Sequence, residues 1–259
     1  MAAKNKPLKL ISLARAVVAY GKIVRDPNQL AEVFSLADSL SEPTMMERIA
    51  KSFRAQPAGA RALAERKRVR VNLDELDRLP EDTLGRAYAK FMRDNGLMPE
   101  SLPSLEVTNE HDFIRAHLYE THDMWHAMTG FESDVAGELG LQGFYAAQVD
   151  GPLATAILAA GMLNTALFAL HDRDARLDAI TVGWLAGRRA KSLFGFDWEA
   201  SWRRPLADVR REMGINPEGF GAAARRSSLT RFAEGEREET APRGEVARSS
   251  NDTLAAAVS

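Results

Sequence analysis

The spacing of apolar and polar residues predicts an all-α protein. Apolar residues recur at the spacing of a helical face, and no run of the chain alternates in the manner of a β-strand. Proline, glycine and Asp-Pro-Asn sequences divide the chain into separate helices. After a first helix within residues 1–25, we predict helices over residues 28–40, 43–55, 82–95, 108–128, 132–148, 175–194 and 205–214. Residues 60–75 are charged and irregular, and no element is expected there.

One further segment has an unusual pattern. Gly151–Leu170 contains no charged residue and is about as long as a bilayer-spanning helix. It begins with Pro152, is rich in Ala and Gly, and contains polar residues such as Asn164. These features favour a buried central helix over a transmembrane one. Small residues such as Ala159 and Gly161 would allow close helix contacts or leave room for a long apolar ligand.

The composition excludes several classes of site. The net charge of −2 does not suggest a nucleic-acid-binding protein. The absence of cysteine excludes disulfides, cysteine nucleophiles, thiolate zinc sites and cysteine-ligated iron–sulfur clusters. P-loop, GxGxxG, GxSxG and HExxH motifs do not occur. After Pro217 the chain is rich in Arg, Glu, Ser, Gly and Ala, so we predict a disordered tail over residues 218–259.

The N-terminus is basic. Residues 1–25 contain six Lys and Arg residues and no acidic residue before Asp26. Leu10, Leu13 and Val17 recur at helical spacing within this stretch. Three interpretations remain open: an ordinary first helix, a basic amphipathic helix on an anionic membrane surface, and an organelle transit peptide.

The stretch from His122 to His126 carries the candidate chemistry. In a helix of about 100° per residue, His126 lies about 40° around the axis from His122, and Asp123 about 100°. The three side chains therefore share one side of the helix, and Glu138 can return from the next helix as a fourth ligand. Imidazole and carboxylate together suit zinc, iron or manganese. The alternative is a surface helix whose polar face carries two histidines by chance.

The remaining histidines fit the site less well. His111 shares the face of His122 but lies about 16 Å away along a helix, too far to bind the same ion. His117 lies nearly opposite His126 on the helix. His171 ends the charge-free segment, where a cation is favourable at a helix C-terminus. With Asp172 it is also the one additional pair that a metal-dependent hydrolase could use.

Several blocks resemble the coenzyme Q biosynthesis protein 4 family. The resemblance covers roughly residues 26–215. Its most specific part is H-D-M-W-H at residues 122–126 with Glu138, followed by a block that ends in G-F-Y-A-A-Q at Gln148. Supporting blocks are L-P-E-D-T-L-G-R-A-Y at 79–88, G-R-R-A-K at 187–191 and a long block at 197–215.

This resemblance implies an all-helical fold, which we assign to a single multi-helix domain over residues 26–217. The residue pattern alone predicts the basic amphipathic helix of residues 1–25 that precedes it. The resemblance implies a metal, assigned as zinc, held by His122, Asp123, His126 and Glu138, with Fe²⁺ or Mn²⁺ as alternatives. It also implies a groove for a polyprenyl chain. The candidate substrate-binding residues are Phe144, Gln148, Ala159 and Gly161.

The resemblance also implies a function in ubiquinone biosynthesis. The expected activity is metal-dependent removal of the C1 carboxylate of a polyprenylated hydroxybenzoate, with hydroxylation at that carbon as a variant. The alternative is a non-catalytic lipid-binding scaffold with a structural metal. Expected partners are the prenylated aromatic substrate, other quinone-biosynthesis proteins, an anionic membrane surface and a second copy of the chain. The expected location is the bacterial cytoplasm at the inner membrane, or alternatively the mitochondrial matrix face.

Overall fold

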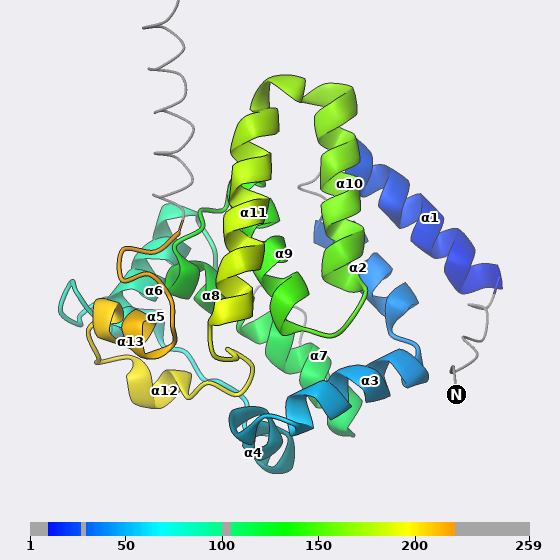
Figure 1. Ribbon diagram of the computed structural model, residues 1–259. Helices are drawn as coiled ribbons and strands as arrows, with labels where there is room; N and C mark the ends of the chain where they lie inside the picture. Colours follow the sequence, from blue (N-terminus) through cyan, green and yellow to red (C-terminus); the bar gives the residue numbers. More distant parts are fainter. Residues whose placement is uncertain (1–9, 27–29, 100–104, 221–259) are drawn as a thin grey trace, which may run out of the picture.

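The computed structural model describes residues 10–26, 30–99 and 105–220. All regular secondary structure in this part of the chain is helical, apart from one isolated bridge between Thr83 and Pro205 (Figure 1). The elements are α1 Leu10–Arg25, α2 Leu30–Leu40, α3 Pro43–Arg54, α4 Pro57–Glu65, α5 Leu73–Leu76, α6 Leu84–Asp94, α7 Glu110–Glu120, α8 His122–Thr129, α9 Val135–Gln148, α10 Leu153–Phe168, the 3-10 turn η2 Leu170–Asp172, α11 Arg173–Arg189, α12 Trp198–Ser201 and α13 Leu206–Glu212. The predicted all-α fold is confirmed.

Helices α9 and α11 form the most extensive helix pair of the described residues, and glycines allow it. A Cβ atom built on Gly183 would lie 1.9 Å from the backbone oxygen of Gly140, and one on Gly187 would lie 2.7 Å from that of Phe144. Gly143 makes the same kind of approach to the backbone of α11. Any side chain at these positions would push the two helices apart, so the glycines set their separation.

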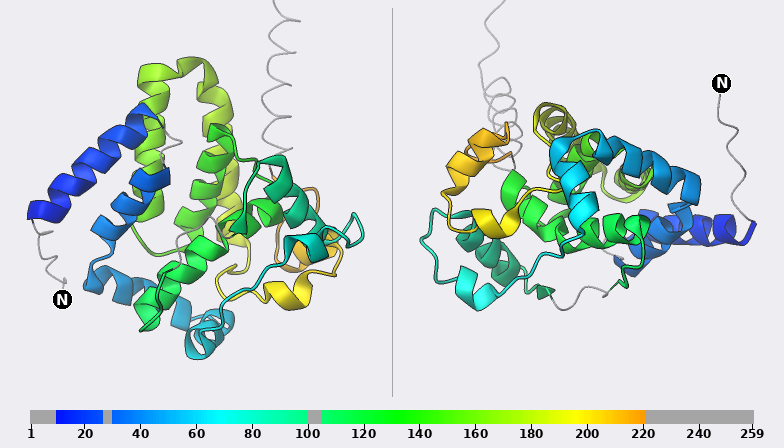
Figure 2. Two further views of the ribbon diagram at one scale, coloured as in Figure 1. Left: turned by 180° about the vertical axis from the view of Figure 1, so that it is seen from behind. Right: turned by 90° about the horizontal axis from the view of Figure 1, so that it is seen from below.

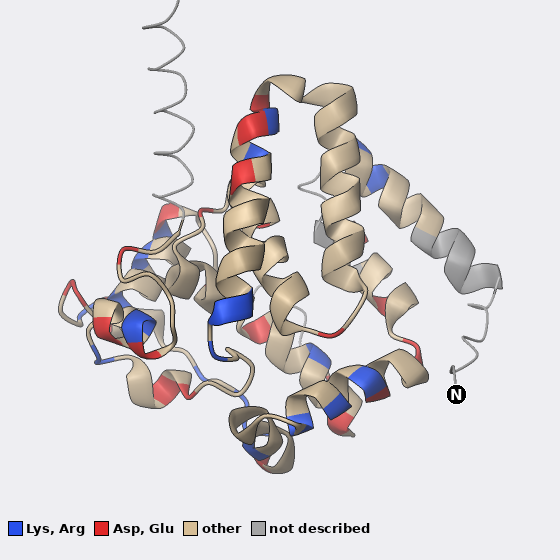
Figure 3. Ribbon diagram, in the orientation of Figure 1, with Lys and Arg blue, Asp and Glu red and all other residues tan. Residues whose placement is uncertain are grey.

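Helix α10 lies between α9 and the N-terminal helices α1 and α2 (Figure 2). Ala160 packs with apolar residues of α1 and α2, and Gly161 packs against α9. Figure 3 shows that α10 carries no charged residue. The outward-facing Leu163 and Leu167 are nevertheless 42% and 60% exposed. The predicted central apolar helix is therefore present, but only one of its faces is buried.

The predicted helix over residues 108–128 is divided in two at Thr121. The backbone of Thr121 has φ −99° and ψ 0°, and its hydroxyl donates to the backbone oxygen of His117 at 2.7 Å. Such a hydrogen bond, four residues back, commonly bends a helix. α8 begins at the next residue, and the two histidines have different surroundings: His117 lies against Phe113 and Phe194, and His122 lies beside Glu138.

The segment predicted to be irregular, residues 60–75, contains most of α4 and the first three residues of α5. The sequence Pro57-Ala-Gly59 suggested a break, but Pro57 begins α4, where its missing N–H costs nothing. Gly59 is buried, and a Cβ atom there would lie 2.4 Å from the backbone oxygen of Phe53. The glycine thus allows α3 and α4 to pack closely, which the local sequence does not reveal.

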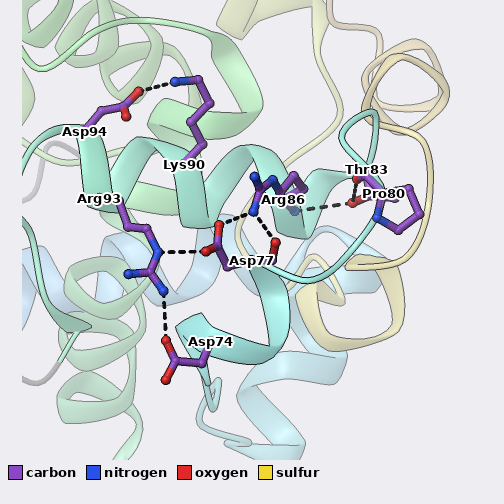
Figure 4. Close-up of polar contacts among 8 residues, drawn as sticks. All are labelled: Asp74, Asp77, Pro80, Thr83, Arg86, Lys90, Arg93 and Asp94. Carbon is purple, nitrogen blue, oxygen red and sulfur yellow. Dashed lines mark hydrogen bonds and ion pairs between the residues drawn. The ribbon is translucent and has the colours of Figure 1, made fainter.

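Ion pairs join α5 to α6, the helix that supplies an aromatic wall of the site described below (Figure 4). Asp77 pairs with Arg86, and its Oδ2 atom lies 3.1 Å from Nε of Arg93. Arg93 also reaches Asp74, with 2.8 Å between Nη2 and Oδ1. These pairs fix the outer side of α6, whose other side presents Phe91 toward α8.

The last described residues, Glu218 to Phe220, lie against the domain. The Phe220 amide donates to the backbone oxygen of Thr129 at 2.7 Å, and its ring packs near Phe131. The predicted disordered tail lies outside the described residues from position 221 onward, as does the start of the basic N-terminus, residues 1–9. None of the described helices is long and apolar enough to cross a membrane.

Candidate metal centre

Two adjacent helices bring three potential metal donors together. His122 and His126 come from α8, and Glu138 comes from the first turn of α9. One donor atom of each lies within 4.8 Å of the others. Nε2 of His126 is 3.1 Å from Oε1 of Glu138, and Nε2 of His122 is 3.7 Å from its Oε2. A single cation could contact all three side chains after small shifts.

The turn between α8 and α9 places Glu138. Gly130 ends α8 in the left-handed conformation, with φ 77°, and its amide donates to the backbone oxygen of His126 at 2.7 Å. Asp134 caps α9 by accepting a hydrogen bond from the Gly137 amide at 2.7 Å. Glu138 follows one residue later and therefore faces back toward α8.

The orientation of His126 is set by the backbone. Its Nδ1 atom lies 2.9 Å from the backbone oxygen of Phe131, which can only accept, so Nδ1 carries the proton. Nε2 is then left with its lone pair, or with a second proton, facing Glu138. This atom is buried, Oε1 of Glu138 lies 3.1 Å from it, and the Phe91 ring stacks on the imidazole at 5.0 Å. A buried imidazole nitrogen that is oriented through its second nitrogen and faces a carboxylate fits a metal ligand.

Charge in the metal-free site is strongly coupled. Burial alone would raise the pKa of Glu138, but the facing His126 and His122 hold it well below its usual value. Burial works against the protonated form of His122, but Glu138 and then Asp123 raise the pKa of this histidine overall. Both pKa shifts have the same cause, because a protonated histidine and the ionised Glu138 carboxylate stabilise each other. A metal ion bound at the Nε2 atoms of the two histidines would take the place of protons on those atoms.

The three donors lie in the wall of a largely apolar cavity of about 420 Å³. It extends from α8 and α9 toward α2, α3, α7 and α10. Its polar wall residues near the donors include Asp123, Tyr145 and Gln142. The apolar part is lined by residues such as Ile23, Val33, Leu40, Met46, Ile49, Ile114, Leu118, Leu139, Val149, Leu153 and Ile157. A cavity of this composition suits an apolar ligand with one polar end held at the donors.

The sequence model of the family described as coenzyme Q (ubiquinone) biosynthesis protein Coq4 matches residues 5–218. The chain belongs to the Coq4 family. It is 26% identical over 215 residues to the mitochondrial ubiquinone biosynthesis protein COQ4 homolog of Xenopus tropicalis, covering 80% of this chain and 73% of that protein. It is 27% identical over 231 residues to mitochondrial coq-4 of Neurospora crassa, covering 86% of this chain and 62% of that protein.

The fold is also that of a solved structure. A crystal structure of a candidate ubiquinone biosynthesis protein from Nostoc punctiforme superposes with a TM-score of 0.70 at 26% identity. The match covers 79% of this chain and 98% of the Nostoc chain. Family membership therefore assigns this Coq4 protein to ubiquinone biosynthesis.

Of the four ligands predicted for the Coq4 site, Asp123 is placed apart from the other three. It lines the cavity next to His122 but does not belong to the group whose donor atoms lie within 4.8 Å. Because it follows His122 on the helix, its side chain points about 100° away around the axis.

The four predicted substrate-binding residues occupy different environments. Gly161 lines the cavity. Phe144 is fully buried in the main core, and Ala159 is exposed on the outer face of α10. The side-chain amide of Gln148 bonds the backbone of α11 and of the segment that follows it. Its Nε2 donates to the oxygen of Gly187 at 2.8 Å, and its Oε1 accepts from the amide of Leu193 at 3.0 Å.

The other histidines lie outside the donor group. His117 is buried between Phe113 and Phe194, and burial, with a smaller contribution from Arg68, lowers its pKa to about 4. His111 lies 3.5 Å from Glu47 at the surface of α7. His171 is in η2, at the turn between α10 and α11, and its side chain is 79% exposed.

Two site residues were missed at the level of sequence. Tyr145 stacks on Trp125 at 4.1 Å and lies 5.8 Å from the His122 ring. It follows Glu138 by seven residues, two turns along the same face of α9, and this spacing could have revealed it. Phe91 has no such signal, because only the packing of α6 on α8 brings it to His126.

Proposed function

We propose that this Coq4 protein removes the C1 carboxylate of a polyprenylated hydroxybenzoate in a metal-dependent reaction. The observation that carries the proposal is the position of the three donors in the wall of an apolar cavity. Such a cavity can take a prenyl chain while the aromatic head group stays beside the donors. Both parts of the ligand then meet surfaces that match their chemistry.

His122, His126 and Glu138 are the residues that would hold the ion, with Asp123 as the candidate fourth ligand. Two imidazoles and a carboxylate suit Zn²⁺, Fe²⁺ or Mn²⁺. When bound, the ion supplies a positive charge that orients the carboxylate or a neighbouring ring oxygen and stabilises developing negative charge. The chain itself supplies the orientation of His126 through Phe131 and a largely apolar binding surface beside the donors.

Loss of CO2 from a ring carbon leaves an electron pair that must be received. In the simplest version a proton replaces CO2 at C1, so that a benzoate and a proton become an arene and CO2. Asp123 is the carboxyl group in the cavity wall outside the three-donor group, and it is the candidate to hold that proton. In the oxidative version, an arenecarboxylic acid, O2, two electrons and two protons give a phenol, CO2 and water. That version requires a reductant from outside the chain.

The exposure of the site favours catalysis over a structural metal. Glu138 is 41% exposed, and the group contains three donors rather than a closed set of four. Structural zinc sites usually close their coordination with four protein ligands, whereas catalytic sites leave a position open. A lipid-binding scaffold would need the cavity but no open position at the ion.

We also propose that the protein works at an anionic membrane surface, together with other quinone-biosynthesis proteins. A substrate with a polyprenyl tail resides in the bilayer. In α1, Val17 and Val18 are 64% and 59% exposed, beside the exposed cations Lys22 and Arg25. Exposed apolar and basic side chains on one helix are typical of interfacial attachment. The inner membrane of a bacterium and the matrix face of a mitochondrion would both provide such a surface.

The deciding experiment is metal analysis of the purified protein combined with turnover of a prenylated hydroxybenzoate, under air and without oxygen. CO2 release in both conditions supports the proton version, and release under air alone supports the oxidative one. Asp123→Asn then tests the role of Asp123. Loss of metal from this variant would indicate that Asp123 is a ligand. Full metal content with lost turnover would indicate that Asp123 holds the proton. Bound metal without turnover in any condition favours the scaffold.

A further inference from the structure

Arg210, in α13, is a buried cation that faces only backbone oxygens. It is 8% exposed, and no carboxylate among the described residues forms an ion pair with it. Nε donates to the oxygen of Met128 at 2.8 Å, Nη2 to that of Ala127 at 2.9 Å, and Nη1 to that of Pro217 at 3.0 Å. Burial lowers the pKa of Arg210 to about 10, so the guanidinium is still protonated at neutral pH.

These contacts close the C-terminal end of the metal-binding helix. The last carbonyl groups of a helix have no partner within it, and they form the negative end of its dipole. In α8, Arg210 donates hydrogen bonds to two of these oxygens, and the Phe220 amide donates to that of Thr129 at 2.7 Å. The Gly130 amide takes the oxygen of His126. A Cβ atom on Gly130 would lie 3.3 Å from Nη2 of Arg210, so the packing here leaves little freedom.

We propose that Arg210 is a positioning residue for the metal site, holding α8 at the rotation that aims Nε2 of His126 at Glu138. His126 directly precedes the two residues that Arg210 holds. A turn of α8 about its axis would move the imidazole away from both the Phe131 oxygen and Glu138. The guanidinium resists this turn because its planar group of donors meets carbonyls on two successive residues.

Lysine cannot replace this arrangement, because its ammonium group cannot present donors to three carbonyls in the fixed geometry of a planar guanidinium. The chain also provides a matched control. Arg211, the next residue in α13, is exposed and pairs with Asp208 on its own helix at 2.7 Å. Arg211→Gln therefore removes an arginine from the same helix without touching α8.

The inference rests on the proposed metal site, so the test has one arm with metal and one without. With metal, Co²⁺ affinity and the visible spectrum of the Co²⁺ protein are measured for wild type, Arg210→Gln, Arg210→Lys and Arg211→Gln. Residues that orient a metal ligand typically change metal affinity by about 10–100-fold when replaced. We expect a loss of that size and a changed spectrum in both Arg210 variants, and wild-type behaviour in Arg211→Gln.

Without metal, long-range ¹H–¹⁵N NMR reports which nitrogen of His126 carries the proton. We expect Nδ1 protonation in wild type and Arg211→Gln, and a mixture of tautomers in the Arg210 variants. If Arg210→Gln does not fold, Arg210→Lys, which keeps the charge, carries both measurements. Wild-type Co²⁺ affinity, spectrum and tautomer in a folded Arg210 variant would overturn the inference. A wild-type protein that binds no metal but shows the tautomer difference would overturn the metal site and leave the positioning intact.

Discussion

Nδ1 of His126 lies 2.9 Å from the backbone oxygen of Phe131, five residues later in the chain. The hydrogen bond joins the last turn of α8 to the loop that leads into α9. It therefore links the orientation of one candidate metal donor to the path of the chain that delivers another, Glu138. The donor geometry of this Coq4 protein depends on the backbone as much as on the three side chains.

Replacing His126 with Ala should strongly lower the metal content of the purified protein, because it removes a buried donor. His117→Ala should not, because His117 lies on the other side of the kink at Thr121. Metal per folded protein, measured by elemental analysis, checks this. Equal metal content in both variants and wild type would rule out the donor assignment.

A bulky residue at Gly161 should hinder long prenyl ligands more than short ones. A Cβ atom there would lie 2.3 Å from Cδ2 of Leu139, so Gly161→Val should push that side chain into the cavity. Overpacking costs about 1–3 kcal/mol of folding stability, so the protein should still fold. The displaced Leu139 side chain should lower the affinity for a long-chain ligand, and each 1.4 kcal/mol of lost binding free energy is about tenfold in Kd. Ala159→Val, on the exposed face of α10, is the control. An equal loss for every chain length would indicate general destabilisation instead.

Stability should fall in acid partly because of His117. Burial lowers its pKa from the ordinary value of 6.5 to about 4, so between these values the unfolded chain binds a proton that the folded protein excludes. The free energy of unfolding is therefore unaffected by protonation of His117 above pH 6.5 and falls as the pH decreases from 6.5 toward 4. The size of this fall is about 3 kcal/mol. Urea unfolding from pH 4 to 7 should show a flatter profile for His117→Gln but not for the exposed control His171→Gln. Matching profiles for the His117 variant and wild type would contradict the prediction.

Gly183→Ala should destabilise the protein by about 1–3 kcal/mol or more, because the new Cβ atom would meet a backbone oxygen of α9 that cannot move alone. Gly21→Ala is the matched control in α1, where a Cβ atom meets nothing within 4 Å. That change should stabilise by about 0.5–1 kcal/mol through helix propensity. Chemical denaturation measures both. A stable Gly183→Ala protein would mean that α9 and α11 lie further apart than described.

Binding to anionic liposomes should depend on the basic N-terminus. Each basic residue near an anionic membrane contributes about 1 kcal/mol, so exchanging Lys4, Lys6 and Lys9 for Glu should weaken sedimentation with the vesicles. Binding should also fall as salt rises. Val17→Ser together with Val18→Ser tests the exposed apolar side chains of α1. Undiminished binding of the charge-reversed protein in high salt would place the attachment elsewhere on the surface.

Local sequence signals account for most of the helices. Pro43 at the start of α3 and the Thr83 cap of α6 are chemical signals that act within one turn, and both helices lie where they were predicted. The errors come from residues whose role depends on distant neighbours. Gly59 resembles a helix breaker until the oxygen of Phe53 lies against it, and Thr121 resembles a helix residue until its hydroxyl bends the chain.

In the candidate site, too, only residues that are close in sequence could be predicted. Spacing along the chain predicts His122 and His126 because one helix carries both, and Glu138 because a short turn at Gly130 returns the next helix to the same place. It also predicts Asp123, which the structure places beside the group rather than in it. Arg210 is 84 residues from His126 and bonds the oxygens of the next two residues, Ala127 and Met128, through the packing of α13 on α8. No local pattern could signal that contact.

The kink at Thr121 lies between two histidines whose pKa values are shifted in opposite directions. His117 and His122 are five residues apart, yet the pKa of the first is lowered and that of the second is raised. On one side of the kink the ring is enclosed by phenylalanine, and on the other it faces a carboxylate. In the metal-free protein near pH 6.5, one short stretch of backbone thus carries an uncharged imidazole and an imidazolium, one on each side of Thr121.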